Sequence, residues 1–585
     1  MVESTLVAVL GVISIVVVAA FSERLGLAAP LSLVLVGIGL SFVPGVPHPE
    51  VEPELVLAGV LPPLLYSAAV NMPVVDFRRN LRPITGLAVL LVVVSTLSAG
   101  WLFHWLLPEI GWPVAFALGA VISPTDAVAA TSVGRRLGLP RRLLTVLEGE
   151  GLVNDASALV LLRSAVAAMA GAVSVGGIVV EFLYAVVVAV GVGLLVGVVN
   201  VRARALLNDA VLNTAISFVV PFLAYLPAEA LDASGVLAVV VAGLVTGHLS
   251  PRRLRAQDRI TESKNWRTVA FLLESSMFLL MGLGIKTLVD EVDEAGLGIG
   301  RALGVALAAT ALVIVVRMVF TAPLVAGMRR EQERAERMRP RLESVRAFLA
   351  GDRGDPAMEQ RFRRASPKRR ESFARRVEKA SADVRFRLNE TLGWRGGVVL
   401  AWAGMRGAIT VAAAQTLPQD TPDRSQLILV AYVVATTTLL LQGLTLPVVI
   451  RAVRVPEDDP ERLREDFVRL ATELVDVADA VLDDGALVDR DGQPFPERVV
   501  EKVRADVGGP LERGPRAGEQ PDPERRDGPF AYVRLRMRVL DAQADRLQVA
   551  RSRGTYDSET LGKLQTGLDV EAARLEQLAE RADER

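Results

Sequence analysis

Cysteine is absent from this chain of 585 residues, so disulfide bonds and thiolate metal sites are excluded. Histidine is scarce as well: His48, His104 and His248 all fall near the ends of apolar segments, so no relay of imidazoles is available at their middles. The metalloprotease pattern H-E-x-x-H is missing. The formal net charge is −1 and no separate basic domain stands out, so nothing indicates a nucleic-acid partner.

Charge is also missing from most of the length of the chain. Charged residues make up 22% of the sequence, but they crowd into residues 329–394 and 456–585. The remainder is strongly apolar, which gives a mean hydropathy of +0.37 and indicates a membrane protein. Apolar segments long enough to cross a hydrocarbon core of about 30 Å recur along it. Thirteen spans are predicted, near residues 4–21, 27–44, 54–72, 83–107, 112–133, 143–171, 176–200, 210–228, 233–249, 267–290, 299–327, 395–417 and 427–450.

The loops between these segments alternate in charge. Loops such as "DFRRNLR" (76–82) and "GRRLGLPRR" (134–142) are basic, whereas those between them, such as "VDEVDEAG" (289–296), are acidic or neutral. By the positive-inside rule the basic loops are cytoplasmic. We therefore expect a protein of the cell membrane with its N-terminus outside and its C-terminus in the cytoplasm. The N-terminal segment has no basic region before it and carries Glu3, so we expect a retained span and not a cleaved signal.

Two domains follow from this distribution. Residues 1–455 form the transmembrane domain, interrupted by a charged cytoplasmic insert at 329–394, which is expected to be a helical hairpin. Residues 456–585 form a cytoplasmic helical domain, with a flexible break at 508–529 where Pro, Gly and Arg are frequent. No catalytic motif occurs in this tail, so regulation or self-association is the expected role.

Two spans are expected to be broken helices. In the fifth span, Ser123, Pro124 and Thr125 directly precede Asp126, and proline disfavours helix at the residue before it. In the twelfth span, Gly404 and Gly407 flank Arg406 near the middle of the membrane. Irregular backbone at membrane depth survives only where it is buried in protein or lines a water-filled cavity. The pair predicts an all-α transporter with inverted repeats and a site near the midplane.

The sixth span carries acids where the apolar pattern continues unbroken. Glu150 and Asn154 are four residues apart and share one helix face, while Asp155 points about 100° away. Each carboxylate at the bilayer centre costs roughly 2.5–3.5 kcal/mol on insertion scales, so a functional reason is expected. Arg317, deep in the eleventh span, needs an anion, and Glu150 is the partner we expect for it. That pairing would leave Asp155 uncompensated.

Three further charged residues in the spans receive no role. Glu274 either faces the same cavity or bonds a neighbouring helix. Arg163 reaches towards the end of its helix, and Glu148 is left unassigned.

The motifs "SPTDAVA" (123–129), "LEGEGLVNDAS" (147–157) and "WAGMRGAITVAAA" (402–414) resemble, in this order and in these spans, the NhaP/NHE family of monovalent cation/proton antiporters. The resemblance covers residues 1 to about 455. It implies a homodimer in which each protomer has a dimerisation domain of spans one to three and eight to ten. It also implies a mobile core of spans four to six and eleven to thirteen, which moves like an elevator.

The resemblance also implies roles for single residues. Asp155 is expected to bind the transported cation and the proton, and Thr125 to lend the cation an oxygen. Asn154 and Asp126 would tie the crossing helices together. Glu150 would pair with Arg317, and Arg406 would support the crossing. No cofactor is implied beyond the transported Na⁺, Li⁺ or K⁺ and the proton.

The chain departs from the family's usual pattern at two positions. Gly151 stands where relatives commonly have a serine, one helical turn before Asp155. Ser67 stands in "LPPLLYSAAV" (61–70), where many relatives have an acid. Both differences leave the preference among monovalent cations open.

Competition for one carboxylate explains exchange. A buried Asp that is protonated binds no cation, and one that is ionised does. Because relatives of this fold with two adjacent aspartates carry a second charge, the Asn154–Asp155 pair predicts electroneutral, one-for-one exchange.

Two other classes of protein are alternatives to this secondary transporter. A cation channel could use the same acids, but nothing reads as a selectivity filter. An intramembrane hydrolase could use paired acids, but Asp126 and Asp155 belong to no protease-like motif.

Overall fold

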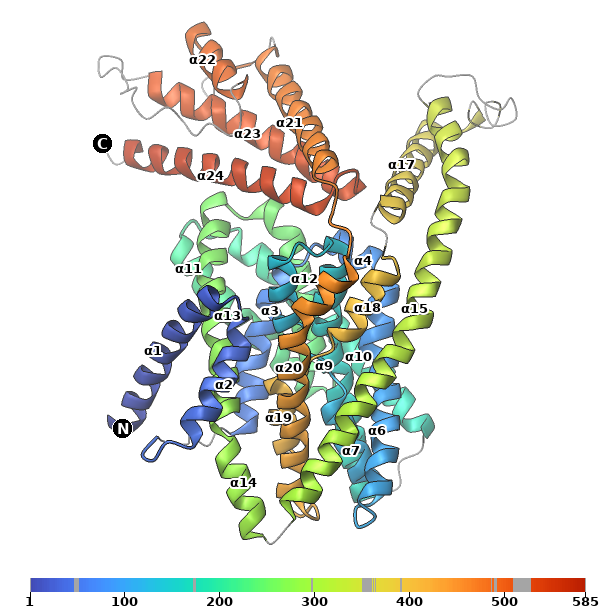
Figure 1. Cartoon of the computed structure of the whole chain (residues 1–585). Coiled ribbons are helices and arrows are strands. Elements are labelled where there is room, and N and C mark those ends of the chain that lie inside the picture. The colour runs from blue at the N-terminus through green and yellow to red at the C-terminus, as the bar shows by residue number, and fades with distance from the viewer. Residues whose placement is uncertain are drawn as a thin grey trace.

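The protein is described here from a computed structural model in which every regular element is a helix within the described residues. These are residues 2–46, 52–171, 175–295, 298–349, 364–389, 392–484, 492–508 and 528–583, together with positions 360, 362, 487 and 488. A bundle of long apolar helices forms one layer, and a smaller group of polar helices lies on one end of it (Figure 1). The predicted class, an all-α polytopic membrane protein, is confirmed.

The first six predicted spans each fall on a helix or on a series of short helices. The third and fourth contain a π-helical turn, and the fifth is interrupted. The elements are α1 (Val2–Leu25), α2 (Ala29–Ser41), η1 (Leu55–Val60) with α3 (Leu61–Asn71), α5 (Leu81–Thr85) with η2 (Gly86–Leu91) and α6 (Val92–Leu106), α7 (Trp112–Ile122) with α8 (Val128–Arg136), and α9 (Arg141–Ala170). The short helix α4 (Val74–Arg79) precedes α5.

The later spans follow the same order. They are α10 (Val175–Arg204), α11 (Ala210–Ala230), α12 (Gly235–Arg253), α13 (Ala256–Leu283) with α14 (Ile285–Glu294), α15 (Ile299–Leu349), α18 (Trp394–Trp402) with α19 (Ala408–Gln415), and α20 (Arg424–Val453). Among the described residues, eight helices are long and apolar enough to cross a membrane, and shorter apolar helices accompany them. The number thirteen therefore stays a prediction.

The helix bounds of the tenth segment differ from the sequence expectation. The tenth segment is not one helix over 267–290, because α13 begins at Ala256 and ends at Leu283, and α14 starts again after Gly284. The predicted insert starts inside a helix, since α15 continues from the apolar segment to Leu349, and its start at residue 329 stays a prediction. Its polar residues after 328 are mostly Arg and Glu, which are good helix formers and allow the helix to continue into water.

The rest of the insert and the tail are also helical where they are described. Helix α17 (Pro367–Asn389) packs against α15, and the segment joining them lies largely outside the described residues. The tail contains α21 (Pro460–Leu482), α22 (Glu497–Gly508), α23 (Gly528–Arg553) and α24 (Ser558–Asp583). Asp459 caps α21 by accepting hydrogen bonds from the amides of Glu461 and Arg462. The flexible break expected at 508–529 lies almost wholly outside the described residues.

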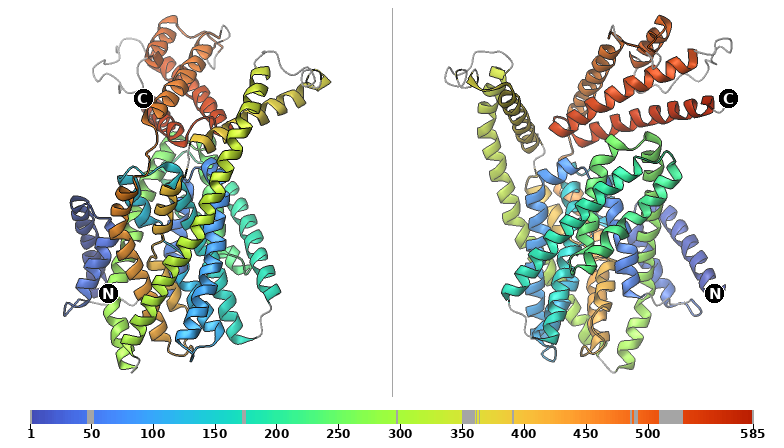
Figure 2. Two further views of the ribbon diagram at one scale, coloured as in Figure 1. Left: turned by 45° about the vertical axis from the view of Figure 1, so that its right-hand side comes forward. Right: turned by 180° about the vertical axis from the view of Figure 1, so that it is seen from behind.

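Two apolar clusters hold the membrane layer together. The larger contains buried residues of α7, α9, α15, α19 and α20 with α2 and the end of α13. The smaller joins α3, α11 and α12 with parts of α9 and α10. Helix α9 contributes to both, so it lies between them. Figure 2 shows the tail helices gathered on one end of the bundle, with the hairpin of α15 and α17 projecting beside them.

Candidate functional site

The two predicted breaks are present, and they touch each other. Helix α7 ends at Ile122 and α8 begins at Val128, while α18 ends at Trp402 and α19 begins at Ala408. The amide of Asp126, in the first break, donates a hydrogen bond of 2.7 Å to the carbonyl of Met405 in the second. The two non-helical segments therefore meet inside the bundle, as a pair of crossing broken helices requires.

Polar side chains compensate for the backbone groups that the breaks set free. The Arg406 guanidinium donates to the carbonyl of Ile122 at 3.1 Å and to that of Gly404 at 2.6 Å. The Asp126 carboxylate accepts a hydrogen bond from the amide of Val128 at 2.8 Å, so it caps the start of α8. Since no water is available in a bilayer core, these side chains stabilise backbone that would otherwise be unsatisfied.

Close approach explains the two glycines of the second break. A Cβ atom at Gly407 would collide with the Asp126 carboxylate, and one at Gly404 would collide with the Arg317 side chain. The breaks pack so closely that only a hydrogen fits at these positions.

Helix α9 brings a buried ion pair against this crossing. Arg317 contacts Glu150 through two hydrogen bonds, one of them 2.8 Å between Nη2 and Oε2, and both side chains are buried. The Arg317 Nε donates to the carbonyl of Leu400 at 3.2 Å. The Thr125 hydroxyl donates to Oε1 of Glu150 at 2.7 Å. This is the partner that the sequence analysis expects for Arg317, and the pair has the additional hydrogen bonds that a buried pair needs.

Asn154 has one satisfied end and one free end. Its amide nitrogen donates to the carbonyl of Thr125 at 2.6 Å and contacts the Thr125 hydroxyl at 3.1 Å. Its carbonyl oxygen Oδ1 is buried and has no hydrogen-bond partner. A buried acceptor without a partner costs free energy, so the Asn154 oxygen is available to a bound ion without the loss of an existing hydrogen bond.

Asp155 is the acid that the site leaves uncommitted. Its side chain is buried, with 7% of the residue exposed, and it lies close enough to Asp126 for the two charges to interact. Within the described residues no group donates a hydrogen bond to its carboxylate. Asp155 can therefore take up either a proton or a cation without breaking an existing bond.

The unassigned residues lie around this site in different ways. Glu148 pairs with Arg135, and Arg163 pairs with Glu229 of α11. Glu274 of α13 is partly buried and lies within electrostatic range of Asp126. A cavity of about 170 Å³ lies between α13, α14, α19 and α20, on the side away from the tail, and is lined by Met277, Thr287, Ala408 and Gln415 among others.

One contributor to the site was not predicted. The Thr438 hydroxyl of α20 accepts a hydrogen bond of 3.2 Å from the amide of Arg406 and thereby supports the second break. Its signal in the sequence is the run of three threonines at 436–438 in an otherwise apolar span.

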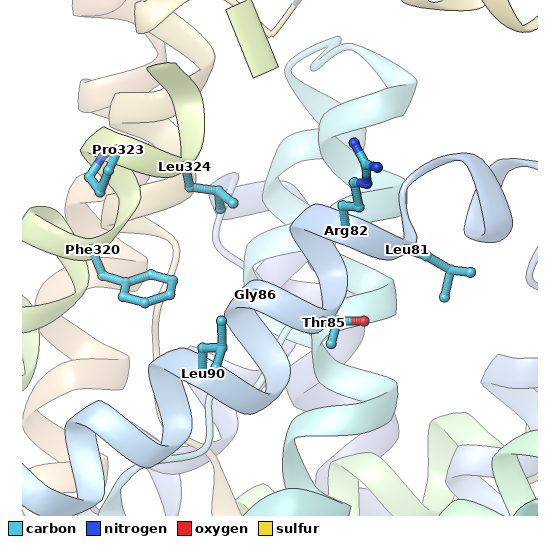
Figure 3. Close-up of a pocket in the computed structure, with 8 residues that line it drawn as sticks. All are labelled: Leu81, Arg82, Thr85, Gly86, Leu90, Phe320, Pro323 and Leu324. Carbon is cyan, nitrogen blue, oxygen red and sulfur yellow. The ribbon is translucent and has the colours of Figure 1, made fainter. Parts of the chain in front are cut away.

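A second cavity lies on another part of the bundle. It runs between α5, η2 and α15 and is lined by Leu81, Arg82, Thr85, Gly86, Leu90, Phe320, Pro323 and Leu324 (Figure 3). None of the candidate residues lines it.

Known proteins are similar to this chain in sequence and in fold. The family model described as the transmembrane sodium/hydrogen exchanger matches residues 11–452. An uncharacterized Na⁺/H⁺ exchanger of Mycobacterium tuberculosis is 31% identical over 579 residues, which cover 96% of this chain and 95% of that protein. A sodium, potassium, lithium and rubidium/H⁺ antiporter of Bacillus pumilus is 35% identical over 284 residues, 46% of this chain and 41% of that protein.

A solved structure has the same fold. The sodium proton antiporter MjNhaP1 of Methanocaldococcus jannaschii aligns with a TM-score of 0.53 and 16% identity, covering 77% of this chain and 99% of that one. The family match spans both broken helices and also α9, the helix that carries the uncommitted carboxylate of Asp155. The chain therefore belongs to the sodium/hydrogen exchanger family, and it is a multi-pass membrane transporter and not an enzyme.

Proposed function

We propose that this protein exchanges one monovalent cation for one proton, with Asp155 as the shared binding residue. The observation that carries the proposal is the Asp155 carboxylate, which has no hydrogen bond from the described residues and lies where two broken helices cross. The partnerless Asn154 oxygen beside it supplies a neutral ligand for a cation. Carboxylate and carbonyl oxygens are the ligands that hard cations prefer.

Competition at this carboxylate produces the exchange. When Asp155 is protonated, no negative charge attracts a cation; when it is ionised, it holds one. If the core crosses the membrane readily only with Asp155 neutralised by either partner, an empty return is disfavoured. Cation flow in one direction is then tied to proton flow in the other.

The neighbouring residues have supporting roles in this proposal. Thr125 and Asn154 position the ion beside Asp155, and Asp126 keeps the first break in shape by capping α8. Glu150 and Arg317 neutralise each other and so leave Asp155 without a cationic partner. Arg406 holds the two breaks together through its bonds to backbone carbonyls.

The transported cation is Na⁺, Li⁺ or K⁺. The Bacillus pumilus relative is named for sodium, potassium, lithium and rubidium, which supports a broad set. Gly151 brings no hydroxyl, and Ser67 of α3 brings no acid, so water and backbone carbonyls complete the ion's ligand shell.

The proposal extends to the movement and the assembly. We define the core helices as α5–α9, α15 and α18–α20, and the scaffold helices as α1–α3 and α11–α13. Residues 1–455 transport by alternating access as the core moves against the scaffold. Two protomers associate through their scaffolds in the cell membrane, and residues 456–585 form a cytoplasmic domain. The N-terminus lies on the side away from the tail in Figure 1, which supports an external N-terminus.

The test is exchange in proteoliposomes of the wild-type protein and of Asp155→Asn. A pH gradient should dissipate on addition of Na⁺, Li⁺ or K⁺ to the wild type. The variant should lose exchange because its amide takes up neither a proton nor a cation by charge. Correct folding of the variant is checked by its thermal unfolding midpoint. Exchange retained in the variant would remove Asp155 from the mechanism.

A further inference from the structure

Helix α24 of the tail lies across the end of the bundle that faces the tail domain (Figure 1). Its first turn contacts the start of α9. Glu559 pairs with Arg141, and Asp557 lies 3.8 Å from the same guanidinium. Arg141 is the first residue of α9, the core helix that carries Asp155. The tail is therefore attached to the end of the helix that holds the proposed binding residue.

The linker into the tail contacts the loop between α8 and α9, next to Arg141. The Asp458 carboxylate accepts a hydrogen bond of 3.1 Å from the amide of Arg141. Glu457 packs against Gly138, where φ is +68° and an added Cβ would lie 3.2 Å from the carboxyl carbon. The loop before α9 is thus held between the linker into the tail and the first turn of α24.

Further along, α24 contacts the scaffold. Asp569 forms a two-bonded pair with Arg259, one of whose bonds measures 3.1 Å, and Glu576 lies 3.8 Å from Arg255. Both arginines belong to the start of α13, and the Arg259–Asp569 pair is largely shielded, with side-chain exposures of 17% and 12%. Gln565 donates to Asp569 at 2.8 Å and orients its carboxylate.

The two attachments lie on one continuous helix. Glu559 and Asp569 are ten residues apart, which corresponds to about 15 Å along a helix axis. Helix α24 is itself fixed, because Leu561, Leu564 and Leu568 are buried in an apolar cluster with Leu470 of α21 and Leu547 of α23. The tail therefore joins core and scaffold as a stiff body.

We propose that α24 is an inhibitory strap that slows exchange by holding α9 and α13 in one relative position. This inference rests on the proposed movement of core against scaffold. An ion pair is lost once its nitrogen and oxygen separate beyond about 4 Å, so a core displacement larger than this must break the contacts at one end of α24. Release of the strap therefore speeds exchange.

The first test reverses the charge of Arg259 or Asp569 singly and then swaps the two charges in a double variant. Arg259→Glu and Asp569→Arg should each raise the rate of cation/proton exchange about two- to fivefold, the range expected for losing a partly shielded ion pair. The double variant R259E/D569R should return to the wild-type rate, which a general disturbance of folding would not do. Arg253→Glu is the matched control. Arg253 is exposed at the end of α12 and has no hydrogen bond or ion pair with the described residues of α24, so the exchange rate of this variant should not change. Single variants no faster than wild type would overturn the strap.

Cross-linking forms the second test, and the absence of cysteine means that introduced thiols are the only ones present. Side chains of an Arg–carboxylate pair separate their Cα atoms beyond the 4.4–6.8 Å or so of a disulfide, so a short cleavable bis-methanethiosulfonate linker is used. The pairs are R141C/E559C and R259C/D569C. With both pairs linked, exchange should fall at least about tenfold and return on reduction, whereas either pair alone should leave it measurable.

The outcomes separate the two proposals. A doubly linked protein that exchanges at its unlinked rate contradicts the strap but not the transport function. An unlinked wild type that exchanges no cation contradicts the function. In that case hydrogen exchange of the amides at 138–145 and 256–262 still tests the contact: it should rise in Asp569→Arg and recover in the double variant, and an unchanged pattern would contradict the strap.

Discussion

At the scale of single residues, the polar groups at the crossing are of two kinds: those with hydrogen-bond partners and those without. Glu150, Arg317 and Arg406 are buried and have hydrogen-bond partners, whereas the Asp155 carboxylate has none within the described residues and the Asn154 oxygen is orphaned. Buried polar groups are normally satisfied. In the proposed function, the free pair is where a transported ion replaces missing protein partners, and the satisfied residues hold that pair in place.

Substitution of Glu150 should separate a structural role from a transport role. Glu150→Gln leaves the Arg317 guanidinium buried without its anion, so we expect a loss of about 3–5 kcal/mol of unfolding free energy. Glu148→Gln is the matched control two residues earlier, where the partner Arg135 is exposed and the loss should be about 0–1 kcal/mol. Thermal or denaturant unfolding in detergent measures both. Equal stabilities of the two variants would argue against the buried pair.

Gly151 is the position where cation preference should respond to one hydroxyl. An added Cβ would lie 3.1 Å from Cβ of Ala127, so a small shift of the first break is needed. Gly151→Ser places a neutral oxygen four residues before Asp155 on the same helix face. We expect the apparent affinity for Na⁺ to rise about fivefold relative to K⁺, the equivalent of one added polar contact.

Gly151→Ala introduces the same crowding without the oxygen and is the control. Apparent affinities come from the cation dependence of pH-gradient dissipation. An equal Na⁺/K⁺ ratio in the two variants would show that the hydroxyl does not reach the ion.

At the scale of elements, the two broken helices depend on glycine where they touch. Gly407→Ala forces a methyl group into the Asp126 carboxylate, and overpacking of this kind costs about 1–3 kcal/mol. We expect lower stability and a strong loss of exchange. Gly304→Ala in α15 is the control, because nothing lies within 4 Å of its added methyl. Thermal unfolding measures the loss of stability, and exchange in proteoliposomes measures the loss of transport. Normal exchange in Gly407→Ala would mean that transport tolerates a wider spacing between the two breaks.

The elements also show how far sequence reasoning reaches. Pro124 and the glycines around Arg406 predicted both breaks, because backbone preferences are local. The end of α13 at Leu283 was not predicted, since Gly284 lies in an apolar run that reads as continuous. The end of α15 at Leu349 has no signal in the apolar pattern, because hydropathy marks where a helix leaves the membrane and not where it stops.

The candidate site followed from the sequence in its residue types but not in its contacts. Glu150 was the expected partner of Arg317 because a deep cation needs an anion, and the family resemblance implied the same pair. The free Asn154 oxygen had no such signal, because it depends on which end of the amide Thr125 occupies. Contacts between Arg141 and Glu559, separated by 418 residues, leave no local pattern at all.

At the scale of the whole molecule, the balance of charge in each cycle is the property to measure. Within the described residues of the crossing, the Asp155 carboxylate accepts no hydrogen bond, and its chain neighbour is the uncharged Asn154. The proposed exchange of one cation for one proton therefore moves no net charge. We expect no transient current when protein adsorbed to a solid-supported membrane receives a Na⁺ concentration jump, while dye-monitored proton movement continues in matched vesicles. A sustained cation-dependent current would contradict one-for-one exchange and point to a second charged participant.

The uninterrupted helix α15 has a mechanical consequence. Its 51 residues correspond to about 76 Å of length, of which the charged final third projects beyond the bundle together with α17 (Figure 2). A rigid helix anchored at one end converts a small tilt there into a larger displacement at its far end, as a lever arm does. A tilt of a few degrees at Arg317, too small to notice near Asp155, becomes a displacement of several ångströms at residue 345. The end of the hairpin is therefore the place where a probe in the water phase would register the proposed movement of the core.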